Sequence, residues 1–188
     1  MEKIKVSVGI SARHVHLTKE AYEALFDHEL TIKSELNQKG QFAANETVTI
    51  KTEKNEFSNV RIIGPLRKYN QVEISMTDAR KLGIKPPVRK SGDLAGADLI
   101  TIETSKGSIT VEACIIADRH VHMSPEKAKE LNVVDDQLLQ LQLDGEKSGI
   151  IDLKAKVAPD SYFEVHLDTD DANAFLINCG DEKDLIIK

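Results

Sequence analysis

Two pairs of histidines are the most distinctive chemical feature of this chain. The hexamer Arg-His-Val-His-Leu-Thr at 13–18 returns as Arg-His-Val-His-Met-Ser at 119–124, and the two copies contain four of the six histidines. Side chains at positions i and i+2 lie on one side of an extended strand but diverge on a helix. Each pair is therefore suited to chelate a metal ion if its backbone is extended. The alternative is a set of hydrogen-bonded core or surface histidines. The four residues are His14, His16, His120 and His122.

Two further residues complete candidate metal sites. His166 lies at the end of a predicted strand and before a capped helix, which is the local setting of both pairs, so it can form a three-histidine set with His120 and His122. Three imidazoles with an open fourth position are common in catalytic zinc sites. For the first pair the best third ligand is Glu73, which alternates with apolar neighbours in a short strand.

A candidate anion site comes from two loops. Arg67 follows Gly64-Pro65 and shares strand parity with Glu73, so an extended backbone between them would project both side chains to one side. A guanidinium beside metal ions offers bidentate recognition of phosphate. Ser91 opens a glycine-punctuated loop that could present a hydroxyl and backbone N–H groups to an anion, although a simple turn explains it equally well.

The elements that must position these residues are mostly short strands. Residues 4–10 alternate apolar and polar side chains, and an unbroken strand would give His14 and His16 the inward parity. Thr18 and Ser124 then begin helices directly after each histidine pair. Residues 29–45 are weakly patterned and are interpreted as a small flap. Further strands are expected at 46–52, 58–63, 71–75, 99–104, 108–116, 137–143, 149–157 and 162–167, with helices begun by Thr77-Asp78 and Thr169-Asp-Asp. This pattern predicts small β-barrels capped by helices.

The bulk composition excludes several function classes. A net charge of −6 with 4% aromatic residues argues against nucleic acid as the main partner. No apolar run approaches the ~20 residues of a membrane helix. The first strand begins too early for a signal peptide, so a cytoplasmic protein is expected. Cys114 and Cys179 are interpreted as buried small hydrophobic residues rather than ligands.

Besides the function that the family resemblance described below implies, these residues are compatible with two others. His14-x-His16 followed by Glu20, and His120-x-His122 followed by Glu126, match the opening of the cupin metal motif, which would make the chain a bicupin-like oxygenase or isomerase. Both glutamates fall in the first turn of a capped helix, where a carboxylate is favoured without any metal. A metal-stapled binding module without turnover is the third interpretation. An open coordination position would separate it from an enzyme.

The ordered motifs of the chain resemble one family. They are Gly-Ile-Ser-Ala-Arg-His-Val-His-Leu at 9–17, Gly-Gln-Phe-Ala-Ala-Asn-Glu-Thr-Val at 40–48, Gly-Pro-Leu-Arg-Lys at 64–68, Gln-Val-Glu-Ile-Ser at 71–75, Ser-Gly-Asp-Leu at 91–94, the second histidine hexamer, and His-Leu-Asp-Thr-Asp-Asp-Ala-Asn-Ala at 166–174. Together they resemble the PduL-type phosphotransacylases, the phosphate acyltransferases that include phosphate propanoyltransferase. The resemblance runs from about Lys5 to Phe175.

The resemblance implies two β-barrels with a dinuclear zinc site at their interface. One barrel would contain residues 1–12 and 118–188, and the other residues 13–117. His14, His16 and Glu73 would hold one zinc ion, His120, His122 and His166 the other, and Arg67 would be catalytic and bind phosphate. The substrates would be a short-chain acyl-CoA (acetyl or propanoyl) and inorganic phosphate, and a homo-oligomer is compatible with the sequence. Relatives that enter bacterial microcompartments carry an N-terminal extension. Its absence here favours a housekeeping cytoplasmic role.

Overall fold

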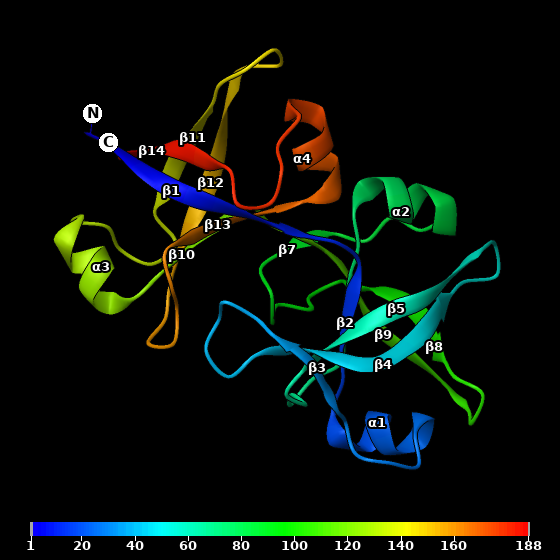
Figure 1. The fold of residues 1–188 in the computed structure, drawn as a ribbon. Helices are drawn as coiled ribbons and strands as arrows, with labels where there is room; N and C mark the ends of the chain where they lie inside the picture. Colours follow the sequence, from blue (N-terminus) through cyan, green and yellow to red (C-terminus); the bar gives the residue numbers. More distant parts are fainter. Residues whose placement is uncertain (1, 188) are drawn as a thin grey trace. The chain divides into compact units, whose positions relative to one another are not determined.

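The computed structural model of the protein describes residues 2–187 and is built mainly from strands (Figure 1). The strands are β1 (Glu2–Ser11), β2 (His14–His16), β3 (Ile32–Glu35), β4 (Phe42–Lys51), β5 (Glu56–Gly64), β6 (Gln71–Glu73), β7 (Val88–Arg89), β8 (Asp98–Glu103), β9 (Ser108–Ala117), β10 (His120–Met123), β11 (Leu138–Leu143), β12 (Gly149–Val157), β13 (Glu164–Asp168) and β14 (Glu182–Ile187). The helices are α1 (Lys19–Leu25), α2 (Met76–Leu82), α3 (Pro125–Glu130) and α4 (Thr169–Phe175). The predicted class, mainly β with short helices, is confirmed.

The chain divides into two compact units, and the first is discontinuous in sequence. Unit 1 contains residues 1–11 and 118–188, and unit 2 contains residues 12–117. In unit 1 the strands close into a barrel in the order β1-β13-β10-β12-β11-β14. The first and last strands pair antiparallel, with Glu2 opposite Ile187, so the barrel is closed by the two ends of the described chain.

Unit 2 also closes on itself. Its sheet runs in the order β3-β4-β5-β2-β6-β9-β7, and β8 bridges β4 and β9. The strands β4, β5, β2, β6, β9 and β8 therefore form a closed ring, with β3 and β7 as additions at its margins. Strand β3 pairs antiparallel with β4, so the segment 29–45 predicted as a flap contains a paired strand.

The two barrels repeat one wiring pattern. In each, a histidine strand (β2 or β10) pairs parallel with one strand (β5 or β12) and antiparallel with another (β6 or β13). The latter strand then pairs parallel with the long strand β9 in unit 2 or β1 in unit 1. The long strand that precedes each histidine pair thus belongs to the other barrel. The unbroken strand that would carry the alternation of residues 4–10 on to His16 is not formed, because β1 ends at Ser11 and β2 begins in unit 2.

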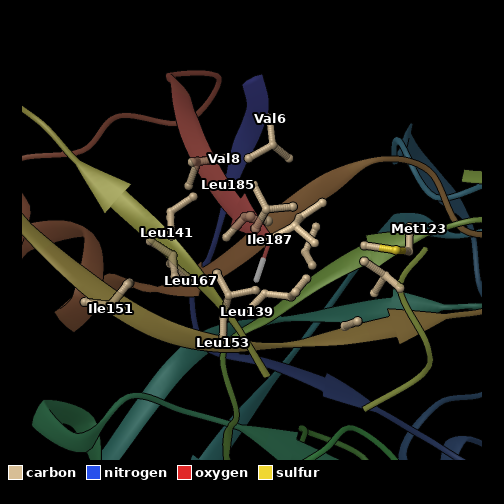
Figure 2. Close-up of a cluster of buried hydrophobic side chains, with 14 of the residues drawn as sticks. Val6, Val8, Met123, Leu139, Leu141, Ile151, Leu153, Leu167, Leu185 and Ile187 are labelled. Atoms are coloured by element: carbon tan, nitrogen blue, oxygen red, sulfur yellow. The ribbon is translucent and has the colours of Figure 1, made fainter. Parts of the chain in front are cut away.

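Each barrel has its own apolar core. In unit 1, alternate residues of β1, β11 and β14 point inward, including the fully buried Val8, Leu141 and Leu185 (Figure 2). In unit 2, Ile50, Ile62 and Ile102 fill the equivalent space. Alternation along the strands explains both cores, since a period of two sends every second side chain to the same face. The histidine strands β2 and β10 therefore each belong to a closed barrel with a buried apolar core.

Several local details differ from the predictions. Ser75 and Asp168, rather than Thr77 and Thr169, are the N-caps of α2 and α4, and each side chain accepts a hydrogen bond from the third helical N–H. Cys114 is buried as predicted, but Cys179 is exposed. Strand β14 was not predicted. Among residues 2–187, no helix has the length and apolar character needed to cross a membrane.

Candidate metal centres and anion site

The first candidate centre lies in unit 2, across the pair β2 and β6. His14 stands directly opposite Glu73 in the antiparallel register, and His16 is two residues farther along the same strand. Each of the three side chains offers a ligand atom within 4.8 Å of the other two. Glu73 Oε2 lies 3.6 Å from His14 Nε2, and its Oε1 lies 3.9 Å from His16 Nε2. The extended backbone thus gathers two imidazoles and a carboxylate, as the His-x-His spacing predicts.

The rings of this centre are oriented by main-chain oxygens. The Nδ1 atoms of His14 and His16 lie 2.9 Å and 3.0 Å from the carbonyl oxygens of Ala12 and Ile63. A carbonyl oxygen accepts a hydrogen bond from Nδ1–H, which leaves Nε2 of each ring with its lone pair toward Glu73. These contacts therefore set both rings in the tautomer that presents Nε2 to a metal ion.

Burial and local charge separate the two rings electrostatically. Burial lowers the pKa of His16 to about 3, and the nearby charges of His14 and Arg67 act in the same direction. Burial also acts to lower the pKa of His14, but the charge and hydrogen bond of Glu73 outweigh it, so that pKa is raised. His16 is consequently a neutral ligand, since a histidine must be unprotonated to bind a metal.

A chain of hydrogen bonds joins Glu73 to Arg67. Gln71 Nε2 donates to Glu73 Oε1 and, at 2.9 Å, to Ser91 Oγ. Arg67 Nη1 lies 3.4 Å from the same hydroxyl and donates to Tyr69 at 3.0 Å, while Nη2 lies 3.4 Å from the Gln41 side-chain oxygen. Among residues 2–187, the hydrogen bonds of Arg67 end on neutral oxygens, so its positive charge is available to an anion.

The position of Arg67 has a different cause from the predicted one. Strand β5 ends at Gly64 and β6 begins at Gln71, so no extended backbone connects Arg67 with Glu73 and the shared-parity prediction is wrong. The loop instead carries Arg67 to the β7–β8 loop, where Ser91 lies. The Gly64-Pro65 peptide in this loop is cis.

The second candidate centre lies in unit 1, across β10 and β13. His120 stands opposite His166, and the ligand atoms of His120, His122 and His166 lie within 4.8 Å of one another. The Nε2 atoms of His120 and His122 are 3.0 Å apart. His120 Nδ1 lies 2.8 Å from the carbonyl oxygen of Asp118, and His122 Nδ1 lies 3.4 Å from Ser161 Oγ. Both rings of the pair therefore repeat the arrangement of the first centre.

His166 is held differently. Its Nε2 lies 2.7 Å from the Tyr162 hydroxyl and 3.2 Å from Glu164 Oε1, and Tyr162 donates to the same carboxylate oxygen at 3.1 Å. Glu164 is only 8% exposed. Burial, together with the charge of Glu164 and the hydrogen bond to it, raises the pKa of Tyr162, so the phenol keeps its proton. Tyr162 also stacks on His122, with ring centroids 5.5 Å apart.

The arginines that precede the histidine pairs close ion pairs. Arg13 binds both oxygens of Asp78 at 2.7–2.8 Å, and Arg119 binds both oxygens of Asp171 at 2.6–2.8 Å. The two aspartates occupy the same place, the third residue of α2 and of α4. These bidentate pairs fix each helix to the start of its histidine strand.

Three functional neighbours were missed by the sequence analysis. Gln71, Tyr162 and Glu164 all lie next to candidate ligands, and Gln71 and Glu164 each precede a ligand by two residues. Strand parity was the available signal, since a residue two positions before a ligand shares its face. Neighbours of this kind tune a metal site through hydrogen bonds to its ligands.

The donor sets fit a transition metal ion. One centre offers two imidazoles and a carboxylate and the other three imidazoles, and either set leaves room for a fourth ligand in a tetrahedral zinc site. The cupin interpretation has no support, because Glu20 and Glu126 are exposed in the first turns of α1 and α3. The side chains that would be ligands in a cupin thus point to solvent, away from a closed coordination shell.

Comparison with known proteins identifies one family. A family model described as phosphate propanoyltransferase matches residues 7–178. A phosphate propanoyltransferase from Lachnoclostridium phytofermentans is 49% identical over 181 residues, which cover 93% of this chain and 84% of that protein. Proteins of the same name from Thermotoga maritima and Salmonella typhimurium are 46% and 42% identical, and each match covers at least 93% of this chain and 85% of the relative.

Proposed function

The chain belongs to the phosphate propanoyltransferase family, and we propose that it transfers a short-chain acyl group, acetyl or propanoyl, reversibly between coenzyme A and inorganic phosphate. The observation that carries this proposal is the continuous hydrogen-bond chain from Arg67 through Ser91 and Gln71 to Glu73. It ties a cation suited to phosphate to a carboxylate suited to a metal ion. A binding module without turnover has no need of that connection.

Two zinc ions per chain are part of the proposal. His14, His16 and Glu73 would hold one ion, and His120, His122 and His166 the other. A zinc ion supplies Lewis-acid polarisation of a carbonyl or phosphoryl oxygen. The protein's own contribution is to orient the imidazoles with Nε2 toward Glu73, which the contacts of Nδ1 with Ala12 and Ile63 achieve for the first pair.

Arg67 and Ser91 would bind the phosphate. The guanidinium offers several N–H donors in one plane, and the Ser91 hydroxyl lies 3.4 Å from Nη1, so both can reach one tetrahedral anion. Tyr69 and Gln41 hold the guanidinium in place through neutral contacts. Neither partner cancels its charge, which favours an anionic substrate over a neutral one.

The reaction follows from direct attack. An oxygen of phosphate forms a bond to the thioester carbonyl carbon, the C–S bond breaks, and the sulfur leaves as the CoA thiolate, which then takes up a proton. Cys114 is unsuited to form a covalent acyl-cysteine, because it is fully buried and burial raises its pKa to about 12. The positive charge of Arg67 would stabilise the negative charge of the phosphate and the charge that develops on the carbonyl oxygen during the attack.

The activity is tested by the phosphate dependence of CoA release. Purified protein with acetyl-CoA or propanoyl-CoA should release free thiol only when phosphate is present, and acyl phosphate should accumulate in equal amount. A thioester hydrolase would release thiol without phosphate. Release without phosphate, or no release from protein that holds its metal ions, would exclude the proposed reaction.

A further inference from the structure

His166, a proposed ligand of the second centre, contacts its neighbouring oxygens through a different ring nitrogen from the four paired histidines. The four histidines of the two pairs make their supporting contacts through Nδ1. His166 makes its contacts through Nε2, to Tyr162 and to Glu164. A neutral imidazole has one protonated nitrogen and one lone pair, so the supporting contact decides which nitrogen is left for a metal ion.

The hydrogen-bond triangle around His166 requires a proton on Nε2. Tyr162 donates its only proton to Glu164, and the carboxylate oxygen lies 3.2 Å from Nε2. A carboxylate oxygen only accepts hydrogen bonds, so the ring atom that meets it carries the proton, and an Nε2–H can donate to Glu164 and to the phenol oxygen at 2.7 Å. The lone pair of the ring then lies on Nδ1.

We propose that Glu164, supported by Tyr162, is a positioning residue that holds the Nε2–H of His166 and presents Nδ1 as the metal ligand. This inference rests on the proposal above that His166 holds an ion. A buried carboxylate in this role fixes the ring and raises the basicity of its other nitrogen. In the second centre the carboxylate of Glu164 would thus hydrogen-bond to a ligand, whereas in the first centre the carboxylate of Glu73 would itself be a ligand.

Space for this carboxylate comes from a glycine on the neighbouring strand. Gly9 of β1 pairs with His166, and a β-carbon added at Gly9 would collide with Glu164 Oε1. In unit 2 the strand beside Glu73 carries Ile115 at the equivalent place. Residue 9 has ordinary extended backbone in β1, so the absence of a side chain serves the close approach of Glu164 rather than a special φ.

The ring nitrogen that binds the ion can be observed directly. Long-range ¹H–¹⁵N correlation spectra of the zinc-loaded protein distinguish coordination through Nδ1 from coordination through Nε2, and the His166→Ala spectrum assigns the His166 signals. Four rings should bind through Nε2 and His166 through Nδ1, with a proton on its Nε2. Binding of His166 through Nε2 overturns the proposal. The coordinating nitrogen is read from the unaltered protein, and the variant serves only to assign the signals.

The strength of zinc binding provides the second readout. Competition with a chromophoric chelator should show one of the two ions bound about 10–100-fold more weakly in Glu164→Ala. Gly9→Ala, which displaces the Glu164 carboxylate without removing it, should weaken the binding of the same ion. Asp118→Ala is the matched control, because Asp118 also precedes a histidine ligand by two residues but its side chain binds Lys154. Unchanged affinity in Glu164→Ala would contradict the positioning role.

The two proposals fail in different ways. If His166 binds zinc through Nδ1 but thiol release does not need phosphate, the acyl transfer is wrong and the role of Glu164 stands. If phosphate-dependent release is observed while His166 binds through Nε2, the role of Glu164 is wrong and the acyl transfer stands.

Discussion

The strands β6 and β13 occupy the same place in their barrels, and each carries a proposed metal ligand and a residue that hydrogen-bonds to it. The donor and acceptor roles of ligand and supporting residue are reversed between the two strands. On β6 the proposed ligand Glu73 accepts an amide N–H from Gln71, two residues earlier. On β13 the proposed ligand His166 would donate through Nε2 to Glu164, two residues earlier. A change of ligand from carboxylate to imidazole is thus accompanied by a change of the supporting residue from amide to carboxylate. We therefore expect ligand and supporting residue to determine zinc affinity jointly at each centre.

The loops that lead into these strands differ in charge. Six residues separate β5 from β6 and β12 from β13, which places Arg67 in the position that Asp160 holds in the other loop. Tyr69 and Tyr162 also correspond, yet one contacts Arg67 and the other Glu164. The duplicated backbone thus carries a phosphate-suited cation in one half only. The comparison predicts that the two halves bind metal alike but bind phosphate unequally.

The largest effect is expected when one proposed metal ligand is removed from each centre in turn. His16→Ala and His122→Ala remove equivalent ligands, each 2% exposed, and each should lower the zinc content by about one ion per chain. Acyl transfer should fall at least about 100-fold, because a Lewis-acid metal contributes several kcal/mol. Elemental analysis and the thiol assay provide the measurement. The solvent-exposed His28 serves as control, and two ions retained in either ligand variant would exclude that residue from its centre.

The next effect concerns the two loops. Arg67→Ala should raise the KM for phosphate about 10–100-fold, since hydrogen bonds to charged groups contribute about 1.5–3 kcal/mol. The matched variant Asp160→Ala should leave that KM within about twofold of wild type, because the side chain is exposed. Steady-state kinetics with phosphate varied at saturating acyl-CoA measures both. Equal losses toward phosphate and acyl-CoA would indicate that Arg67 supports the fold.

An exchange of ligand chemistry sharpens the comparison of β6 and β13. His166→Glu alone should weaken zinc binding at the second centre about tenfold or more, because the new carboxylate faces Glu164. The double variant His166→Glu with Glu164→Gln recreates the Gln-x-Glu order of β6 and should recover most of the lost affinity. Chelator competition measures each affinity. A double variant as weak as the single one would show that ligand and support are independent.

The smallest expected difference is in stability. Arg13→Ala leaves Asp78 buried without its bidentate partner, with a side chain 4% exposed, whereas the Asp171 side chain left by Arg119→Ala is 15% exposed. Arg13 also lies 4.3 Å from the ring centre of Phe57. Arg13→Ala should therefore lower the free energy of unfolding by about 1 kcal/mol more than Arg119→Ala. Urea denaturation followed by circular dichroism compares them, and the reverse order would contradict the burial argument.

Much of the local structure could be predicted because it depends on short-range patterns. The histidine strands, the helix starts at Thr18 and Ser124 and the hairpin of β8 and β9 follow from alternation and capping residues. The N-caps at Ser75 and Asp168 were missed because a hydroxyl or carboxylate two residues away is equally suited to cap.

Other features could not be read from such patterns because they depend on distant pairing. The apolar run at 185–187 becomes a strand only through its contacts with β1 and β11. The contact of Arg67 with Ser91 joins two loops, and no periodicity links them. The discontinuous barrel of residues 1–12 with 118–188 was likewise expected only from the family resemblance, since residues 2–16 alone suggest one continuous strand.

The exchange of long strands between the barrels also orders events during synthesis. Strand β1 is synthesised before the strands of unit 2, whereas its partners β13 and β14 are synthesised after them. The strands of unit 2 lie within residues 12–117 and can pair while translation continues. Unit 1 cannot close before β13 and β14 have been synthesised, and until then β1 has two unpaired edges that a neighbouring nascent chain could occupy. The lysines at positions 3 and 5 of this strand give it the charge that discourages such pairing.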